Sequence, residues 1–184
     1  DGNFDIYFSD WNVTYWDDIT NMGSEVNDPK QWDSQPSVSA DGNSLYFASA
    51  RDSLTGIDIY ETHRDTKGKW TKAKKLPAPI NTNGNDKSPF IHQDGRTLYF
   101  SSDSLPGLGG YDIFVSRMDT KGNWGEPVNL GYPINTEADE VGFFASTDGR
   151  FGYFSSNSVK GSSGYDVFSF ELYPKARPQK VTLQ

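Results

Sequence analysis

The chain has 184 residues, a formal net charge of −8 and no cysteine. This length suffices for one domain with a sizeable core. The acidic balance argues against a nucleic-acid partner, because phosphate binding needs a basic surface. The lack of cysteine excludes disulfides, thiolate chemistry and zinc fingers. No apolar run approaches the roughly 20 residues that span a bilayer, so we predict no direct membrane span.

One phrase recurs four times along the chain, as GNFDIY, TGIDIY, GGYDIF and SGYDVF. Its aspartates are separated by 53, 54 and 54 residues, and a set of tryptophans repeats with the same period. The repeated residues are Asp5, Asp58, Asp112 and Asp166, with Trp16, Trp70 and Trp124. Self-similarity at a fixed period of this length is typical of solenoids and propellers.

Each period predicts four antiparallel strands. In the first full repeat, residues 36–40 and 45–49 flank an Asp-Gly pair. Asp-Gly between apolar segments is a strong hairpin signal, because both central positions of a two-residue turn favour positive φ. In the next repeat the recurring phrase opens a third strand at 111–117, and a DTKG turn leads to a fourth around 124–130.

The sequence therefore predicts an all-β protein, a β-propeller of four-stranded antiparallel blades. We expect a partial blade at 1–28, blades at 29–82, 83–136 and 137–172, and a basic, proline-containing exit linker at 173–184. Propellers have about 4–8 blades. About three blades' worth is present, so we expect this chain to be the C-terminal portion of a larger propeller.

The repeated aspartates are expected to be structural. Each would begin a strand just after a loop, where a carboxylate can accept backbone N–H bonds. A catalytic or metal-binding role would require the four copies to converge, whereas blades distribute equivalent residues around a ring. The repeated tryptophans open the outer strand and are expected to pack between neighbouring blades.

The sequence predicts no catalytic residues, no metal site and no bound cofactor. The two histidines, His63 and His92, are both expected to be exposed beside turns. Asp86, Asp139 and Glu140 could bind a cation, but no loop spacing requires it. A glycine-rich phosphate loop is also missing. We therefore expect the protein not to be an enzyme.

Two sets of loops would lie on opposite faces of the propeller. The Asp-Gly and DTKG turns of one face are nearly alike, whereas the second-to-third and blade-to-blade loops of the other diverge. Repeats of this kind usually bind through the diverse set. The candidate partner-binding residues there are Trp32, Arg51, Asp86, Lys87, Asp103, Glu137, Asp139 and Glu140. Solvated charges without a partner, and a gap-filling role for Trp32, are the alternative interpretations.

The stretches PSVSADGNSLYFAS…GIDIY and SPFIHQDGRTLYFSS…GGYDIF resemble the PD40 repeat, the propeller unit of TolB-like periplasmic proteins. With W…EPVNLGYPINTEADE, they resemble more narrowly the propeller of OmpA-family envelope proteins of Bacteroidetes, a group that includes a lipoprotein associated with type IX secretion. The resemblance covers residues 2 to about 172. It implies a periplasmic, outer-membrane-associated protein with envelope proteins as partners, and cell-wall association through domains outside this chain.

The expected function is a non-enzymatic scaffold for protein–protein interaction. The alternative is a carbohydrate-binding propeller that recognises glycan or peptidoglycan fragments. Repeated aromatic pockets at equivalent loop positions would favour the lectin. We expect the loop aromatics not to repeat, which favours a protein partner.

Overall fold

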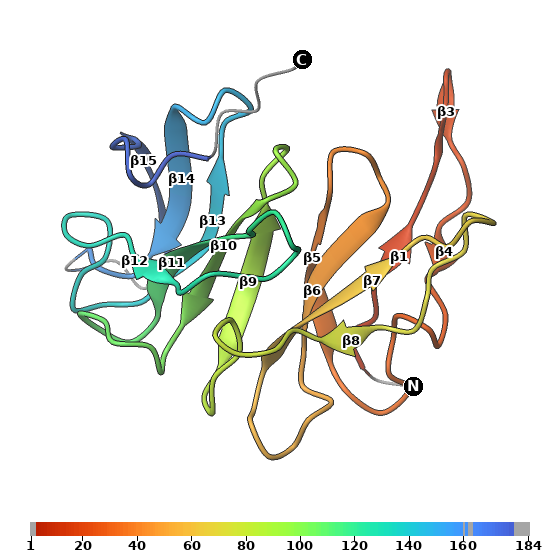
Figure 1. The fold of residues 1–184 in the computed structure, drawn as a ribbon, viewed down its shortest axis with the longest axis horizontal. Helices are drawn as coiled ribbons and strands as arrows, with labels where there is room; N and C mark the ends of the chain where they lie inside the picture. The colour runs from red at the N-terminus through yellow and green to blue at the C-terminus, as the bar shows by residue number, and fades with distance from the viewer. Residues whose placement is uncertain (1–2, 160, 162–163, 179–184) are drawn as a thin grey trace.

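A computed structural model describes residues 3–159, 161 and 164–178, and this part of the chain contains strands but no helix (Figure 1). Two four-stranded antiparallel sheets follow the repeat period. The first consists of β5 (Asp33–Val38), β6 (Ser44–Ser49), β7 (Asp58–His63) and β8 (Lys74–Lys75). The second consists of β9 (Asp86–Ile91), β10 (Thr97–Ser102), β11 (Asp112–Arg117) and β12 (Val128–Asn129).

Two incomplete sheets flank this pair. A three-stranded sheet is formed by β13 (Glu140–Ala145), β14 (Phe151–Ser156) and β15 (Asp166–Glu171). At the other end, β1 (Tyr7–Phe8) pairs with β4 (Thr20–Asn21). Between them β2 (Trp11–Asn12) and β3 (Tyr15–Trp16) form a separate hairpin, which projects from the molecule in Figure 1. This hairpin replaces a DTKG turn and was not expected.

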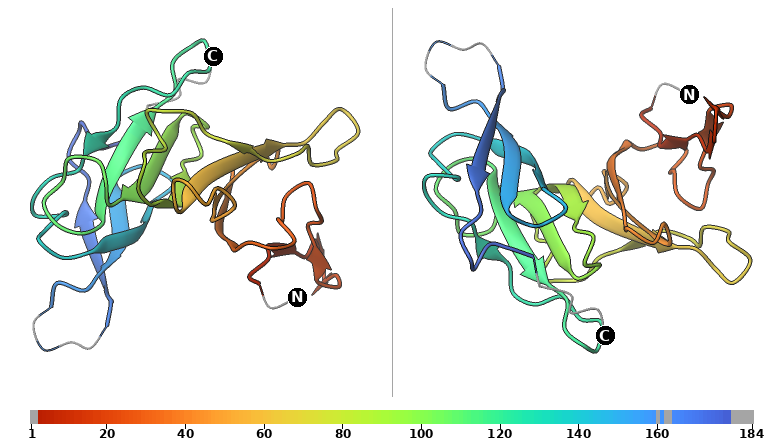
Figure 2. Two further views of the ribbon diagram at one scale, coloured as in Figure 1. Left: turned by 90° about the horizontal axis from the view of Figure 1, so that it is seen from below. Right: turned by 90° about the horizontal axis from the view of Figure 1, so that it is seen from above.

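The sheets lie side by side and fan out from one another (Figures 1 and 2). Their first strands are adjacent, because β9 contacts both β5 and β13. The repeated aspartates open the third strands β7, β11 and β15, as the spacing predicts. The all-β, four-stranded propeller prediction is therefore confirmed. No helix long and apolar enough to cross a bilayer occurs in the described part of the chain.

The Asp-Gly hairpins differ from the expected two-residue turns. Only the glycine has positive φ, as at Gly42 with φ 71°, whereas Asp41 does not. The Gly42 N–H donates to the Ser39 carbonyl, and Asp41 Oδ1 accepts the Asn43 N–H at 3.0 Å. The loop therefore has four residues built around a type I turn. The side chain of the aspartate holds this turn, so its backbone need not enter the left-handed region.

Each first strand carries a bulge at an equivalent position. The bulge residues Gln35, Ser88 and Gly142 all have positive φ, at 55°, 52° and 66°. This conformation is unfavourable for glutamine and serine, but it turns Gln35 onto the next sheet. There Gln35 Oε1 accepts the Ser88 N–H at 2.9 Å, and Ser37 Oγ accepts the Ile91 N–H at 3.0 Å. These two bonds therefore tie β5 to β9 at the bulge.

The core lies between sheets rather than within one. Tyr46 and Ile59 of one sheet pack with Phe100 and Phe114 of the next. Trp124 packs on this cluster, with its ring centroid 6.1 Å from that of Tyr46. It therefore lies between neighbouring sheets, where a repeated tryptophan was expected.

The other repeated tryptophans differ from each other. Trp70 packs on the cluster between the N-terminal strands and the first complete sheet, beneath the Arg64 guanidinium at 4.6 Å from its ring centroid. Trp16 is 67% exposed and does not pack between blades as expected. The β2–β3 hairpin carries it away from the sheets, and its neighbour is Trp11, with ring centroids 5.3 Å apart.

Residues 173–178 contact the sheets at several points, although the sequence indicated a linker from 173 onward. Ala176 is buried, and its carbonyl accepts the Tyr99 hydroxyl proton at 2.6 Å. The Tyr173 hydroxyl donates to the Leu130 carbonyl at 3.0 Å. The segment therefore covers the junction between the last two sheets. The remainder of the expected linker, 179–184, lies outside the described residues.

Candidate binding face

The loops expected to bind a partner run from the first to the last sheet on one face, which we call the loop face. It comprises the second-to-third loops and the sheet-to-sheet loops, namely 28–34, 51–55, 84–87, 103–109, 137–140 and those residues of 157–163 that the structure describes. Three repeated polar devices, namely an aspartate, an asparagine and a buried acid, hold these loops in place. They decide which of the candidate side chains remain accessible.

The first device is the repeated aspartate. Asp112 is 1% exposed, and its Oδ2 accepts the N–H groups of Leu108 and Gly109 at 2.8 and 3.2 Å. Asp58 is also buried and pairs with Lys75 of the fourth strand at 2.8 Å. Both carboxylates join a loop or an outer strand to the start of the third strand, which supports the structural role expected of them.

The two end copies of this aspartate are less enclosed. Asp5 is half-buried, and its Oδ2 accepts a hydrogen bond from Asn21 Nδ2 at 2.7 Å. Asp166 is exposed, because no fourth strand lies beside β15 in the described part of the chain. Position in the repeat is therefore shared by all copies, but burial is not.

Asp112→Ala is expected to lower the free energy of unfolding by about 1–3 kcal/mol, because the partly buried loop donors lose their acceptor. The matched control is Asp166→Ala, which changes an exposed copy and is expected to cost less than about 0.5 kcal/mol. Urea unfolding of both variants followed by circular dichroism measures the difference. Equal losses would show that the buried copy does not fix the loop.

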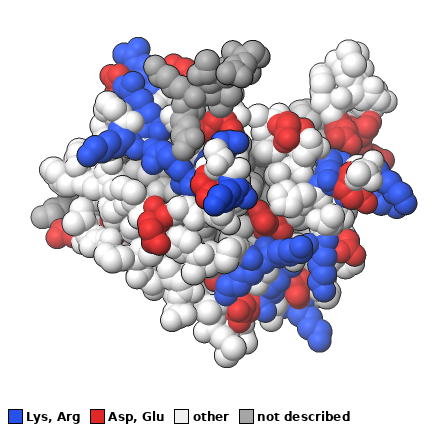
Figure 3. Space-filling model, viewed as in Figure 1, with Lys and Arg blue, Asp and Glu red and all other residues white. Residues whose placement is uncertain are grey.

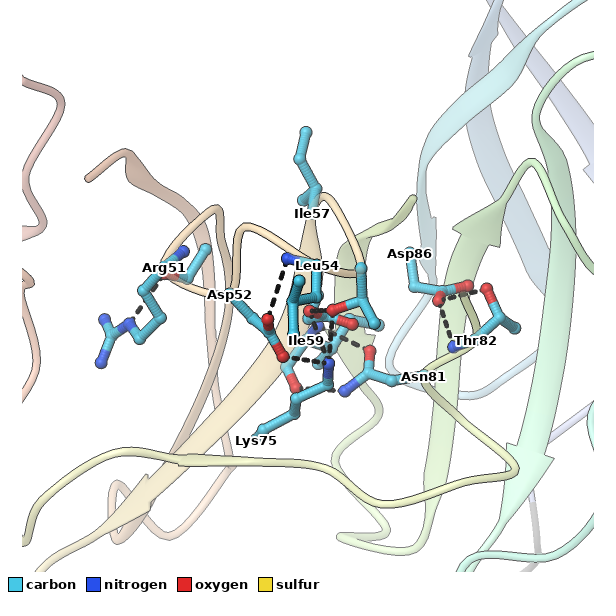
Figure 4. A network of polar contacts seen from close by, with 12 residues as sticks. Arg51, Asp52, Leu54, Ile57, Ile59, Lys75, Asn81, Thr82 and Asp86 are labelled. Atoms are coloured by element: carbon cyan, nitrogen blue, oxygen red, sulfur yellow. Dashed lines mark hydrogen bonds and ion pairs between the residues drawn. The ribbon is translucent and has the colours of Figure 1, made fainter. Parts of the chain in front are cut away.

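The second device is an asparagine. It recurs in the sequence in PIN at 79–81 and 133–135 and in VN at 26–27, but the sequence does not show what it does. Asn135 Oδ1 accepts the Ile113 N–H at 2.8 Å, and its Nδ2 donates to the Ile113 carbonyl at 2.9 Å. Asn81 makes the same two bonds to Ile59, at 2.7 and 2.8 Å (Figure 4). Each asparagine therefore clamps a sheet-to-sheet loop onto the third strand of the preceding sheet.

The clamp is present a third time near the N-terminus. Asn27 Oδ1 accepts the Ile6 N–H at 2.9 Å, and Nδ2 donates to the Ile6 carbonyl at 3.0 Å. All three asparagines are buried. A buried amide that satisfies both backbone groups of one residue stabilises the loop and orients it at the same time.

The third device is a buried acid at the start of each first strand. Asp86 and Glu140 are 0% exposed. Asp86 Oδ2 accepts the Thr82 N–H and hydroxyl at 2.6 and 2.8 Å (Figure 4), and Glu140 takes the same two groups of Thr136 at 2.9 and 2.7 Å. Burial raises the pKa of Asp86, although its hydrogen bonds act in the opposite direction.

Asp86 and Glu140 were expected on an exposed, partner-binding loop, and this expectation is corrected. Their carboxylates are used by the loop itself and are closed off from solvent. They also do not gather with Asp139 into a cation site, since the described residues contain no cluster of three potential ligands.

Arg51 is likewise held inside the structure. Its guanidinium pairs with buried Asp33 at 2.5 Å, donates to the Val26 carbonyl at 2.6 Å, and lies over the rings of Phe47 and Tyr60. The side chain is 15% exposed. Arg51 therefore fills the junction between sheets instead of presenting a charge to a partner.

Asp103 cross-links two loops of the same sheet. Its Oδ1 accepts the Asn85 N–H at 2.8 Å and its Oδ2 accepts Asn85 Nδ2 at 2.7 Å. Asn85 Oδ1 in turn accepts the Ile57 N–H of the preceding sheet at 3.0 Å. Partial burial acts to raise the pKa of Asp103, but the bonds from Asn85 outweigh it and hold that pKa below its ordinary value.

One repeat later the same cross-link recurs with the two residue types exchanged, because Asp139 occupies the position of Asn85 and Asn157 that of Asp103. Its Oδ1 accepts the Tyr111 N–H at 3.0 Å, and Asn157 both accepts the Asp139 N–H at 2.8 Å and donates to Asp139 Oδ2 at 3.1 Å. Asp139 is therefore half-buried and bonded across two sheets, not a freely solvated loop charge.

The remaining candidates are accessible to different degrees. Glu137 is exposed, whereas Trp32 and Lys87 are half-buried. Lys87 Nζ lies 3.5 Å from the centroid of the Tyr111 ring, and burial lowers the pKa of Lys87. Acidic and basic side chains are intermixed on the side seen in Figure 3, with blue atoms gathered around β8, so an acidic sector does not dominate that view.

Two leucines that were not among the candidates are prominent on this face. Leu54 is 91% exposed and Leu108 is 54% exposed. They are 54 residues apart and therefore occupy equivalent positions of the second-to-third loops. Their spacing was available in the sequence, but their exposure depends on how each loop folds.

Both histidines were expected to be exposed, and one of them is not. His63 is exposed, but His92 is buried, and its Nδ1 accepts the Asp94 N–H at 3.2 Å inside the hairpin turn. His63 Nδ1 lies 2.9 Å from Ser44 Oγ, and its Nε2 lies 3.5 Å from Glu61.

The Ser44–His63–Glu61 group resembles a triad only in composition. Ser44 and His63 are a cross-strand pair of β6 and β7, and the Ser44 N–H is bonded to Ser39 Oγ in the hairpin turn. The same turn bond recurs with Phe151 in place of Ser44. The arrangement therefore belongs to the hairpin turn. His63 lies beside Ser44 because the two residues are paired at the solvent-exposed end of β6 and β7.

Comparisons with known proteins match the fold alone. No family model and no curated protein matches the chain. TolB from Acinetobacter baumannii superposes with a TM-score of 0.61 at 19% identity, over 91% of this chain and 35% of that structure. A putative TolB from Agrobacterium tumefaciens gives 0.56 at 21% identity, over 84% of this chain and 49% of that one.

A third match is a puromycin-hydrolyzing peptidase from Mycobacterium tuberculosis, with a TM-score of 0.54 at 16% identity, over 94% of this chain and 30% of that structure. The chain thus spans about a third to a half of the length of the structures it matches. Its repeated four-stranded sheets and these likenesses agree: the chain has a TolB-like β-propeller fold.

Proposed function

We propose that this chain is a non-enzymatic propeller module that binds another protein through its loop face, in the periplasm of a bacterium. The observation that carries the proposal is the combination of rigid loops and exposed apolar tips. Side-chain bonds such as Asn85–Asp103 and Asp139–Asn157 pre-organise the loops, while Leu54 and Leu108 remain exposed. Pre-organisation lowers the entropic cost of binding, and apolar anchors within a polar rim suit a protein partner.

The finer part of this proposal is a role as an interaction scaffold at the inner side of the outer membrane, in a type IX secretion or OmpA-like cell-wall-anchoring assembly. Its support is the resemblance of the repeats to the PD40 propellers of OmpA-family envelope proteins. The fold shared with TolB structures is compatible with it. The peptidase activity named for one matched structure belongs to that protein.

A carbohydrate-binding propeller is the alternative, and one observation bears on it. The loop aromatics were expected not to repeat, but Tyr111 and Tyr165 are 54 residues apart and therefore do. A sugar stacks on a free aromatic face, but the Tyr111 face is covered by Lys87 Nζ at 3.5 Å. The Tyr165 hydroxyl is bonded to Asp139 at 3.3 Å. Tyr165 is 50% exposed, so the covered Tyr111 ring is the contact that favours the protein partner.

The test is a variant with Leu54→Asp, Leu108→Asp and Glu137→Lys, all at exposed positions. We expect it to weaken binding to an envelope partner at least tenfold without changing the melting temperature. The partner is captured with the wild-type chain from a periplasmic extract, identified by mass spectrometry, and titrated as a purified protein by calorimetry.

The matched control is Lys67→Glu with Lys121→Glu, in the DTKG turns of the opposite face. These changes are expected to leave the affinity for the purified partner unchanged. Weakening by the control variant alone would place the partner on the opposite face. Retention of the wild-type chain on peptidoglycan or glycan columns, with no protein captured, would favour the lectin.

A further inference from the structure

We propose that the outer edge of β15 is a binding site for one extended peptide strand. The strand would have tryptophan, then asparagine or lysine five residues later, leucine or methionine next to it, and asparagine five residues further on. This site is distinct from the loop face, and it does not depend on the function proposed there.

The pattern comes from what occupies the same edge in the other sheets. Three copies are present in the chain, with a strict spacing. They are Trp16, Asn21, Met22 and Asn27; Trp70, Lys75, Leu76 and Asn81; and Trp124, Asn129, Leu130 and Asn135. In each copy the second residue lies in the short outer strand β4, β8 or β12 that pairs with the third strand of the sheet. The final asparagine is the clamp described above.

No strand fulfils this role for β15 in the described part of the chain. Val167 is the equivalent of Ile59 and Ile113, the residues that Asn81 and Asn135 clamp. Ile59 and Ile113 are 0% exposed, whereas Val167 is 76% exposed. By equivalence, the N–H and carbonyl of Val167 point outward along a sheet edge that no strand among the described residues covers, and such an edge is a ready template for an added strand.

Charge complementarity at this edge selects the occupant. In the first complete sheet, Lys75 of the outer strand pairs with Asp58 at 2.8 Å, and near the N-terminus Asn21 donates to Asp5 at 2.7 Å. Asp166 is the copy of this aspartate in β15, and it is exposed without an ion pair among the described residues. A lysine or asparagine at the equivalent position of an added strand would therefore meet a carboxylate.

An apolar cavity lies next to the same edge. It has a volume of about 310 Å³ and is lined mainly by Ile134, Phe154, Phe168 and Phe170, with Tyr173 among the other lining residues. In the preceding repeat the residues equivalent to the first three form part of the cluster on which Trp124 packs. The tryptophan of the added strand, which precedes the residues that pair with β15, would therefore fit into this cavity.

The experiment uses the full chain and a synthetic peptide with the sequence of residues 69–82, KWTKAKKLPAPINT, labelled for fluorescence anisotropy. We expect saturable one-to-one binding. Alanine in place of Asn81 in the peptide is expected to weaken binding at least fivefold, and a scrambled peptide is expected not to bind. Saturation by the scrambled peptide with the same affinity would overturn the proposal.

Two variants of the protein locate the site. Val167→Pro removes the outward N–H, and Asp166→Lys reverses the edge charge; both positions are exposed, and circular dichroism checks the fold. Each is expected to weaken binding at least fivefold, and a Lys75→Glu peptide is expected to recover affinity for Asp166→Lys. Unchanged affinity in both variants overturns the proposal. So does a wild-type dimer that Val167→Pro converts to a monomer without peptide, because a second copy then occupies the edge.

Discussion

Asn135→Ala is expected to lower the free energy of unfolding by about 2–4 kcal/mol. The side chain satisfies both the N–H and the carbonyl of Ile113, which is fully buried. Truncation leaves these two backbone groups without a partner, and each unsatisfied buried group costs about 1–3 kcal/mol. For a chain of this size we expect the melting temperature to fall by about 2–4 °C for each kcal/mol lost.

Urea unfolding followed by circular dichroism measures this change. The control is Asn123→Ala, which removes an exposed asparagine that bonds within its own DTKG-type turn. Its expected cost is within about 0.5 kcal/mol. A loss for Asn123→Ala as large as that for Asn135→Ala would show that the clamp contributes nothing beyond an ordinary turn.

Asp94→Asn is expected to destabilise the protein by about 2 kcal/mol at pH 7 and by much less near pH 2. The Asp94 side chain is 2% exposed. Burial alone would raise the pKa of Asp94, but hydrogen bonds from the Thr97 hydroxyl and from the Arg96 and Thr97 N–H groups, with the His92 ring nearby, outweigh it and lower that pKa from 3.8 to about 2. A shift of this size corresponds to about 2–3 kcal/mol.

The sign of the pH dependence follows from the direction of the shift. Because the pKa is lower in the folded state, the stabilisation is fully present above about pH 4 and is lost as the pH falls towards 2. Unfolding free energies of wild type and variant should therefore converge over this range. The control is Asp148→Asn, at an equivalent turn on the surface, with a smaller loss expected. A constant difference between Asp94→Asn and wild type from pH 7 to pH 2 would contradict the assignment.

The loop face illustrates why site prediction from the sequence was only partly possible. Arg51, Asp86 and Glu140 are polar residues in divergent loops, and this pattern favours exposure. Each is instead enclosed by groups from other parts of the chain, such as Asp33 with Arg51 and Thr82 with Asp86. Burial of a loop residue depends on how neighbouring sheets close over it, and no local pattern records that.

The sequence by itself determined the repeat, the strand class and the positions of the third strands, because a period of 53–54 residues recurs in aspartates, tryptophans and hairpin turns. Only the tertiary structure decided which copies are enclosed. Asp112 and Asp166 share one sequence context, yet one is 1% exposed and the other is open to solvent. The physical reason is that a sheet of this fold is buried by its outer strand and its neighbours, so equivalent residues differ wherever those elements differ.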